Sequence, residues 1–168
     1  MTESNVVDTN VLEHVFEPTI NANRHIDRLL EKFVAQKRIL CIDSPPEKTK
    51  SRIIAEYNNR LKERLKTMDE QDQRVIWLRY LLLYADRRTI AVDLSDQLGY
   101  QIVPHMDKVG AERSDQVFVY VACALDCVMI SNNKNHITNL RAKLRKAARK
   151  HGSDNTDFLS STDAEAGM

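Results

Sequence analysis

The sequence is poor in glycine, cysteine and closely spaced histidine, and these shortages exclude several classes of protein. Its 168 residues include four glycines and no glycine-rich phosphate loop, which argues against a nucleotide-binding domain of the flavodoxin type. Three cysteines, an odd number without framework spacing, indicate reduced thiols and a cytoplasmic protein. We expect no zinc site, because Cys123 and Cys127 lack further ligands at short spacing and no histidine pair has metal-binding spacing.

Long apolar runs are also missing. The two longest, 75–85 and 117–130, contain Arg79 and Asp126 and are shorter than the roughly 20 residues that span a membrane. No charged and then apolar segment of the signal-peptide type opens the chain. We therefore expect a protein that does not act in a membrane.

The overall charge is close to balanced, at +1, but its distribution along the chain is uneven. Residues 138–151 carry six basic side chains and no acidic one, whereas residues 152–168 carry four acidic side chains and no basic one. Apolar and charged fractions of 42% and 29% are ordinary for a globular chain of one domain. We predict a single domain over 1–151, which includes a C-terminal basic helix, and an acidic, disordered tail over 152–168.

The hydrophobic pattern predicts strands that alternate with helices. Strands are expected over 5–8, 39–42, 89–92 and 128–131, and helices over 23–36, 47–67, 69–83, 94–100, 115–125 and 138–151. The run 115–125 is ambiguous, because its valines favour a strand while its length and alanines favour a buried helix; we predict a helix. The alternation indicates an α/β fold with right-handed crossovers and a mainly parallel central sheet.

Polar side chains gather where the predicted strands end. Asp8 ends the first strand, Asn133 follows the fourth, and Asp115 begins the helix before the fourth strand. Glu56 lies within the helix that follows the second strand. Ligands of open parallel sheets bind at the carboxyl ends of the strands, and converging oxygen donors favour Mg²⁺ or Mn²⁺. Such ions activate water and stabilise charge in phosphodiester cleavage.

These residues resemble the motifs of the PIN-domain nuclease family. The opening Val6-Val7-Asp8-Thr9-Asn10 is similar to the family's first strand with its Asp-Thr-Asn, and Arg52-Ile53-Ile54-Ala55-Glu56 to its second acidic site. Asp115, followed by an apolar helix, looks like the third acidic residue, and Ile130-Ser131-Asn132-Asn133 looks like the closing motif. The four pieces occur in the family's order and cover about residues 5–137.

The resemblance implies a three-layer α/β/α sandwich and a divalent-metal-dependent endonuclease that hydrolyses RNA, or structured DNA as in some relatives. Asp8, Glu56, Asp115 and Asn133 would be the catalytic, metal-binding residues, with Asn10 and Ser131 positioning Asp8 or the water. It further implies a protein that acts alone or as the toxin of a toxin–antitoxin pair, with an inhibitory protein partner. A homodimer is also expected from relatives.

One residue departs from the pattern: Asn133 stands where the family usually has an aspartate. The amide still offers an oxygen but removes one negative charge, which weakens a second metal site in particular. The alternative is therefore a degenerate, non-catalytic PIN-like module that binds nucleic acid or acts as a scaffold.

Each candidate also has a purely structural interpretation. Asp8 and Asp115 are favourable helix caps, and Glu56 could pair with Arg52 or Arg60 one helical turn away. Asn133 could be a turn residue. Three further acids near strand ends, Asp43, Asp93 and Asp96, are expected to serve as turn or cap residues.

The basic segment supplies candidate contacts to the nucleic-acid backbone, because lysine and arginine neutralise phosphates. We expect this role for Lys134, Arg141, Arg145, Lys146 and Arg149. The alternatives are a solvated terminal helix whose bases favour its carboxyl end, and an acidic tail that folds over the helix.

Overall fold

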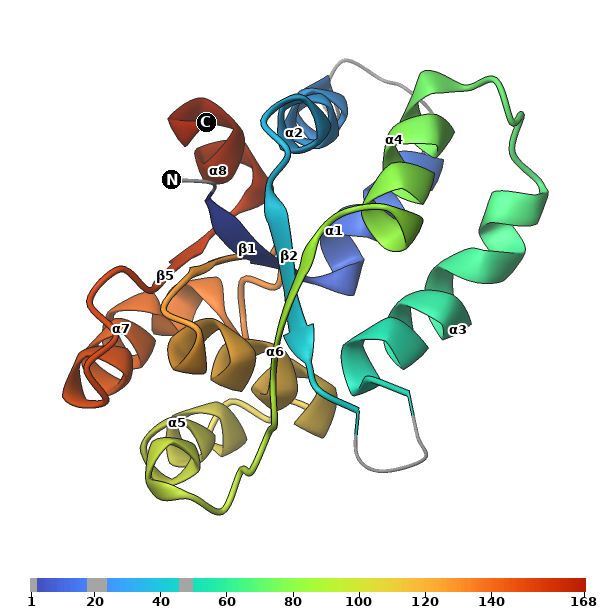
Figure 1. The fold of residues 1–168 in the computed structure, drawn as a ribbon. Coiled ribbons are helices and arrows are strands. Elements are labelled where there is room, and N and C mark those ends of the chain that lie inside the picture. Colours follow the sequence, from blue (N-terminus) through green and yellow to red (C-terminus); the bar gives the residue numbers. More distant parts are fainter. Residues whose placement is uncertain (1–2, 18–23, 46–49) are drawn as a thin grey trace.

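Five parallel strands form one sheet at the centre of the molecule (Figure 1). The structure, a computed structural model, describes residues 3–17, 24–45 and 50–168. The strands are β1 (Ser4–Val7), β2 (Ile39–Asp43), β3 (Arg87–Ile90), β4 (Val128–Ile130) and β5 (Asp157–Leu159). Their order is β3-β2-β1-β4-β5, and every neighbouring pair is parallel. The predicted parallel α/β fold is thus confirmed.

Helices cover both faces of the sheet and complete a three-layer α/β/α sandwich. They are α1 (Thr9–Glu13), α2 (Arg24–Ala35), α3 (Arg52–Lys66), α4 (Gln73–Leu83), α5 (Gln97–Asp107), α6 (Arg113–Ala124), α7 (Arg141–Lys150) and α8 (Ser161–Gly167). Short 3₁₀ turns lie at His14–Phe16 and Thr138–Leu140. On one face α6 contacts four strands, with α5 and α7 beside it; on the other α2 packs between α4 and α8 (Figure 1).

The ambiguous run 115–125 belongs to the helix α6, as predicted. Every residue from Gln116 to Cys123 in this helix is buried. One side packs on β1, β2, β3 and β4, and α3 and α5 cover other sides. The valines fit a helix here because tertiary burial outweighs their strand propensity.

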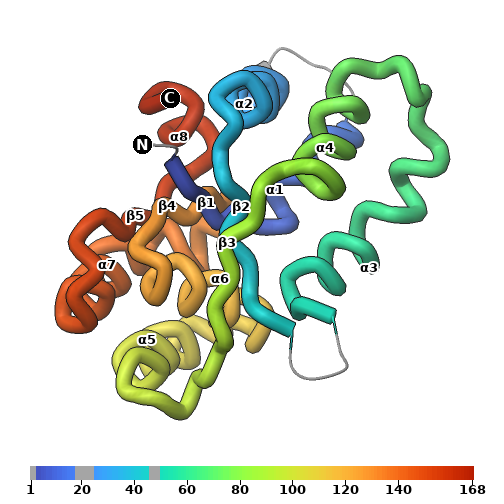
Figure 2. The backbone as a smooth tube through the Cα atoms, viewed as in Figure 1, coloured from blue at the N-terminus to red at the C-terminus, as the bar shows by residue number. Residues whose placement is uncertain are grey.

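The C-terminal segment is ordered, so the prediction of a disordered tail over 152–168 is wrong. Residues Asp157–Leu159 extend the sheet as β5 next to β4, as the traced backbone shows (Figure 2), and Phe158 is 1% exposed. α8 then packs on α2, where Lys32 Nζ donates to Glu165 at 3.0 Å. Two acidic side chains of the segment therefore take part in the fold: Glu165 contacts α2 and Asp157 contacts α7.

Several further element boundaries differ from the sequence prediction; the helix expected over 69–83, for example, begins at Gln73. The third strand is expected over 89–92 but β3 covers Arg87–Ile90, where its register pairs Ile90 with Asp43 of β2. The helix expected over 94–100 begins at Gln97 and continues through Pro104. Proline removes one helical hydrogen bond but does not end the helix here.

Two helices are expected to begin at residues 23 and 47. Their first residues, 23 and 47–49, lie outside the described part of the chain. Within the described ranges 3–17, 24–45 and 50–168, the helices are all too short or too polar to cross a bilayer.

Candidate active site

The site begins where the two central strands end. β1 and β4 are parallel neighbours, and the backbone N–H of Asp8 donates to the carbonyl of Ile130 at 2.9 Å. Asp8 and Ser131, the residues that follow the two strands, therefore lie side by side at the carboxyl edge of the sheet. This is the edge where open parallel sheets bind their ligands.

Asp8 is held by hydrogen bonds on both of its oxygens. Ser131 Oγ and Asn10 Nδ2 donate to Oδ2 at 2.6 and 2.9 Å, and the backbone N–H of Asn10 donates to Oδ1 at 3.3 Å. Asp8 thus also caps α1. Its role as a helix cap and its place in the candidate site are therefore compatible. Asn10 and Ser131 make the contacts expected of positioning residues.

The burial of Asp8 has an electrostatic consequence. The residue is 4% exposed, and this burial raises the pKa of its carboxyl to about 6. The hydrogen bond from Ser131 opposes the rise, while the negative charges of Asp115 and Glu56 add to it. Three carboxyl groups from distant parts of the chain therefore act on one another here.

Glu56 reaches this edge from α3, one turn into the helix. Thr9 Oγ1 donates to its Oε1 at 2.8 Å, which links Glu56 to the residue next to Asp8. Partial burial raises the pKa of Glu56; the Thr9 hydrogen bond opposes this rise and the charge of Asp115 adds to it. Arg60 pairs with Glu13 at 2.9 Å instead of Glu56, so the alternative one-turn pair with Arg60 is not formed.

Asp115 lies in the first turn of α6, with Glu112 and not Asp115 at the capping position. Its Oδ2 faces two side chains from the loop after β4: His136 Nδ1 at 3.1 Å and Asn133 Nδ2 at 3.4 Å. Asn133 also shapes that loop, because its Oδ1 accepts from the backbone N–H of His136 at 3.1 Å. Asn133 is therefore both a turn residue and a neighbour of Asp115.

The four predicted ligands lie at one edge; Asp8, Asn133 and Asp115 are linked by hydrogen bonds, whereas Glu56 is bonded to Thr9 instead. Ser131 Oγ donates to Asp8 and accepts from the backbone N–H of Asn133 at 3.0 Å. The Asn133 side chain in turn donates to Asp115. In the ranges that the structure describes, no set of three or more His, Cys, Asp or Glu side chains is already arranged to hold a metal ion.

The other acids near strand ends have structural roles, as expected. Asp43 accepts hydrogen bonds from Ser51 Oγ and from two backbone N–H groups at the start of α3. Asp93 accepts from Ser95, and Asp96 caps α5 and accepts from the Tyr120 hydroxyl at 2.6 Å. None of these contacts brings them to Asp8.

The basic residues expected to bind nucleic acid divide into two groups. Arg141 makes two hydrogen bonds of 2.7 Å to Asp157, and Arg145 lies 3.7 Å from the same carboxylate. Although burial acts to raise the pKa of Asp157, the hydrogen bonds from Arg141 and the Phe158 N–H lower it below its usual range. Asp157 therefore offsets part of this charge.

The second group, Lys134, Lys146 and Arg149, forms no ion pair with a carboxylate among the described residues. Lys134 and Arg149 are exposed, and Lys146 lines a groove of about 490 Å³ with Lys143 and Lys150, between α7 and α5. The positive charge of Lys143, Lys146 and Lys150 thus lies beside α5.

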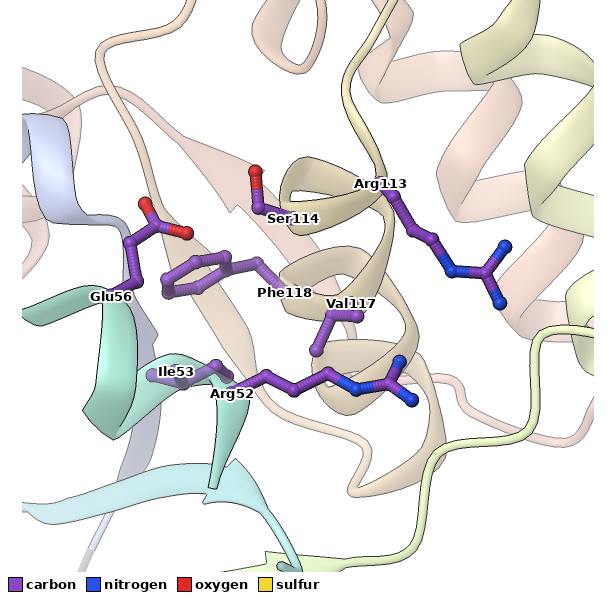
Figure 3. A pocket seen from close by; sticks show the side chains of 7 residues that line it. All are labelled: Arg52, Ile53, Glu56, Arg113, Ser114, Val117 and Phe118. Carbon is purple, nitrogen blue, oxygen red and sulfur yellow. The ribbon is translucent and has the colours of Figure 1, made fainter. Parts of the chain in front are cut away.

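Sequence reasoning did not find a cavity that adjoins the carboxylates. It has a volume of about 260 Å³ and lies between α3 and α6, with Glu56 in its wall (Figure 3). The residues that line it are Arg52, Ile53, Glu56, Arg113, Ser114, Val117 and Phe118. The sequence gives only a weak signal for this cavity. Arg52 and Arg113 are each a single basic residue in the first turn of a helix, and no motif links them. Thr9 and His136 are further contacts of the site that the motifs did not assign.

The sequence was also compared with known proteins. Neither the models of known protein families nor the curated proteins give a match to this chain.

Proposed function

We propose that the protein is an endonuclease that depends on Mg²⁺ or Mn²⁺ and hydrolyses phosphodiester bonds in RNA. The observation that carries this proposal is that hydrogen bonds bring Asp8, Glu56 and Asp115 to the carboxyl edge of the sheet. Asp8 is 4% exposed there, and this burial raises the pKa of its carboxyl to about 6. Clustered carboxyl groups with raised pKa values are typical of functional sites.

The residues present fit a divalent cation. Three of them offer carboxylate oxygens, the atoms that Mg²⁺ and Mn²⁺ prefer, while the amide oxygen of Asn133 accepts from the backbone N–H of His136. In the described parts of the chain, no lysine or arginine forms an ion pair with Asp8, Glu56 or Asp115, so no direct pair offsets their mutual repulsion. Asp8, Glu56, Asp115 and Asn133 would hold the ion, which when bound supplies an activated water and stabilises the leaving oxygen.

The chain's own groups prepare the site in defined ways. Ser131 and Asn10 donate to the same oxygen of Asp8 and fix the plane of its carboxylate. His136 shares a hydrogen bond with Asp115 through Nδ1, which leaves Nε2 to exchange a proton with substrate or solvent. The exposed Lys134, Lys146 and Arg149 supply positive charge for the phosphates of the substrate.

A cleavage assay tests the proposal. Labelled RNA incubated with the protein and Mn²⁺ should be cut, and chelation of the metal should abolish the cut. Asp8→Asn should lower the rate at least a hundredfold, because it removes a charge that holds the ion. Asp93→Asn, which changes an exposed turn aspartate in the same way, should leave the rate unchanged. The absence of cleavage, or equal cleavage by Asp8→Asn, would contradict the proposal.

A second candidate is a non-catalytic module of the same fold that binds RNA. The amide of Asn133 already donates to Asp115, so these two side chains satisfy each other without an ion. Under this candidate, wild-type protein does not cleave RNA or take up Mn²⁺ saturably, and Asn133→Asp restores both by adding a fourth charge. Under the nuclease proposal, wild-type protein already does both.

The location that we propose is the cytoplasm. Cys41, Cys123 and Cys127 are all buried and unpaired. Free thiols of this kind are typical of a reducing compartment.

A further inference from the structure

A groove of about 490 Å³, here called the basic groove, lies between α5 and α7 on one face of the sheet (Figure 1). One wall comes from α7, where Lys143, Lys146 and Lys150 lie three and four residues apart and so share one side of the helix. All three side chains are exposed, and their row extends over roughly 10 Å along the helix axis. A chain of negative groups along this wall can therefore contact all three.

The opposite wall comes from α5 and carries an aromatic ring that solvent reaches. Tyr100, Pro104 and His105 line this wall, about one helical turn apart. Tyr100 is 72% exposed, so much of its ring is open to a ligand. Pro104 is exposed as well and adds apolar surface beside the ring. The basic groove thus combines an accessible aromatic ring with a row of ammonium groups.

The positive charge of the groove is not neutralised within the described part of the chain. Its three lysines form no ion pair there. On another side of α7, by contrast, Asp157 pairs with Arg141 and Arg145. Charges of one sign repel one another, and an anion that lies among them lowers that repulsion.

The acids of α5 do not supply the missing negative charge. Asp96, which caps the helix, and Asp107, at its end, both accept hydrogen bonds from side chains of α6. Partial burial lowers the pKa of His105, and the charges of Lys143 and two further lysines add to this effect. The surroundings of the groove are therefore cationic, which fits a ligand with several negative charges.

Single-stranded nucleic acid has both features that the groove can bind. Its phosphates repeat along the backbone, and its unstacked bases can stack on an exposed aromatic side chain. A duplex offers the same phosphates, but its bases remain stacked on one another, so Tyr100 would gain no partner. An acidic protein segment offers negative charge but has no need of the ring.

We propose that the basic groove binds a segment of single-stranded RNA, with the lysines of α7 on its phosphates and Tyr100 stacked on one base. The residues that line the groove include none of the four predicted metal ligands and none of their hydrogen-bond partners among the described residues. The groove therefore holds the RNA outside the site of cleavage. The inference rests on the proposed function for RNA as the ligand, and adds to it a second binding site and a preference for single strands.

The first test measures binding and not cleavage. Fluorescence anisotropy with a short labelled single-stranded RNA is done in EDTA, where a metal-dependent nuclease does not cut. A triple variant removes the lysines of the groove: Lys143→Ala, Lys146→Ala and Lys150→Ala. The slope of log affinity against log salt should become shallower by about 0.7 for each phosphate that the protein no longer neutralises.

A matched control removes the same net charge from α2 and α3. It combines three substitutions of exposed residues: Arg28→Ala, Lys62→Ala and Lys66→Ala. Its salt slope should equal that of wild type, because these residues lie outside the groove. Melting curves of both triple variants show that they are folded.

The second test concerns the ring of Tyr100. Tyr100→Ala should weaken binding of the single strand about tenfold, because a base stacked on an aromatic side chain contributes an effect of this order. Tyr100→Phe keeps the ring and should bind as wild type does. Neither substitution should change the affinity for a duplex of the same sequence.

The outcomes separate this proposal from the nuclease proposal. A shallower slope in the lysine variant together with a loss specific to the single strand in Tyr100→Ala supports the groove, and if Mn²⁺ then gives no cleavage, the nuclease alone is contradicted. Cleavage in Mn²⁺ with unchanged RNA binding by the groove variants supports the nuclease and overturns the groove.

Other results also overturn the groove as an RNA site. They are a slope equal to that of the control, an unchanged affinity of Tyr100→Ala, equal affinity of wild type for single strand and duplex, and no binding of either RNA. Poly-glutamate that competes as well as RNA of the same charge would indicate a surface for an acidic protein instead.

Discussion

The carboxyl group of Asp8 is charged at neutral pH at a cost in stability. Its pKa in the folded protein is about 6, above the usual 3.8, so the folded state binds more protons than the unfolded state between these values. The free energy of unfolding must therefore fall as the pH rises from about 4 to about 6, and stay lower above that. The difference is on the order of 3 kcal/mol.

Asp8→Asn should abolish the part of this dependence that comes from Asp8. Without a metal, the variant is expected to be about 1–3 kcal/mol more stable than wild type at pH 8, because it carries no buried charge, and to lose this advantage by pH 4. Urea denaturation in EDTA at the two pH values measures both quantities. Asp93→Asn, at a fully exposed turn, should give no gain at pH 8. A pH-independent effect of Asp8→Asn would show that burial of charge is not its cause.

Strand β5 joins the C-terminal segment to the rest of the fold. Phe158 is 1% exposed at the centre of this short strand, and Arg141 of α7 makes two hydrogen bonds to Asp157 beside it. Sheet pairing, a buried aromatic ring and an ion pair thus act on three consecutive residues. The stability of the segment depends on the core and not on its own strand propensity.

Phe158→Ala should cost about 3–5 kcal/mol in the free energy of unfolding, because it leaves a cavity in the hydrophobic core. Chemical denaturation measures the loss. Thr162→Ala, at an exposed position of α8, should change the stability by less than about 0.5 kcal/mol. If both variants matched wild type, β5 would not be part of the cooperative fold.

These elements show why the sequence predicted some of the structure and not the rest. β1, β2 and β4 are buried apolar runs, and a run of that kind is visible in the sequence. β5 has one fully buried side chain, Phe158, between the partly exposed Asp157 and Leu159. β3 begins with the exposed Arg87 and Arg88, so pairing with β4 and β2 determines both strands.

The candidate site divides in the same way. Contacts between strand ends, such as Asp8 with Ser131, follow from parallel topology and are expected. The contacts of Asp115 with His136, and of Glu56 with Thr9, depend on how a loop and a helix are placed, and a linear pattern does not contain that information.

Binding of a cation at the carboxylate edge would change the stability of the whole molecule. A divalent cation that binds the folded state and not the unfolded chain raises the melting temperature by mass action. We expect Mn²⁺ at a hundred times its dissociation constant to add about 2.7 kcal/mol at pH 8, and much less at pH 5, where Asp8 is mostly protonated.

Thermal unfolding with and without Mn²⁺ measures this effect. Asp8→Asn should remove most of the Mn²⁺-dependent rise, and Asp93→Asn should preserve it. An equal rise at both pH values, or in both variants, would place the ion elsewhere on the surface.

The burial of the central part of α6, from Gln116 to Cys123, also governs how slowly the centre of the protein opens. Its peptide N–H groups lie between the sheet and the helices around it, so water reaches them when the surrounding layers separate. Their exchange with deuterium would then report the opening of the entire fold. The exchange rate of this helix, which carries Asp115, is therefore the reference with which the exchange rates of peripheral segments can be compared.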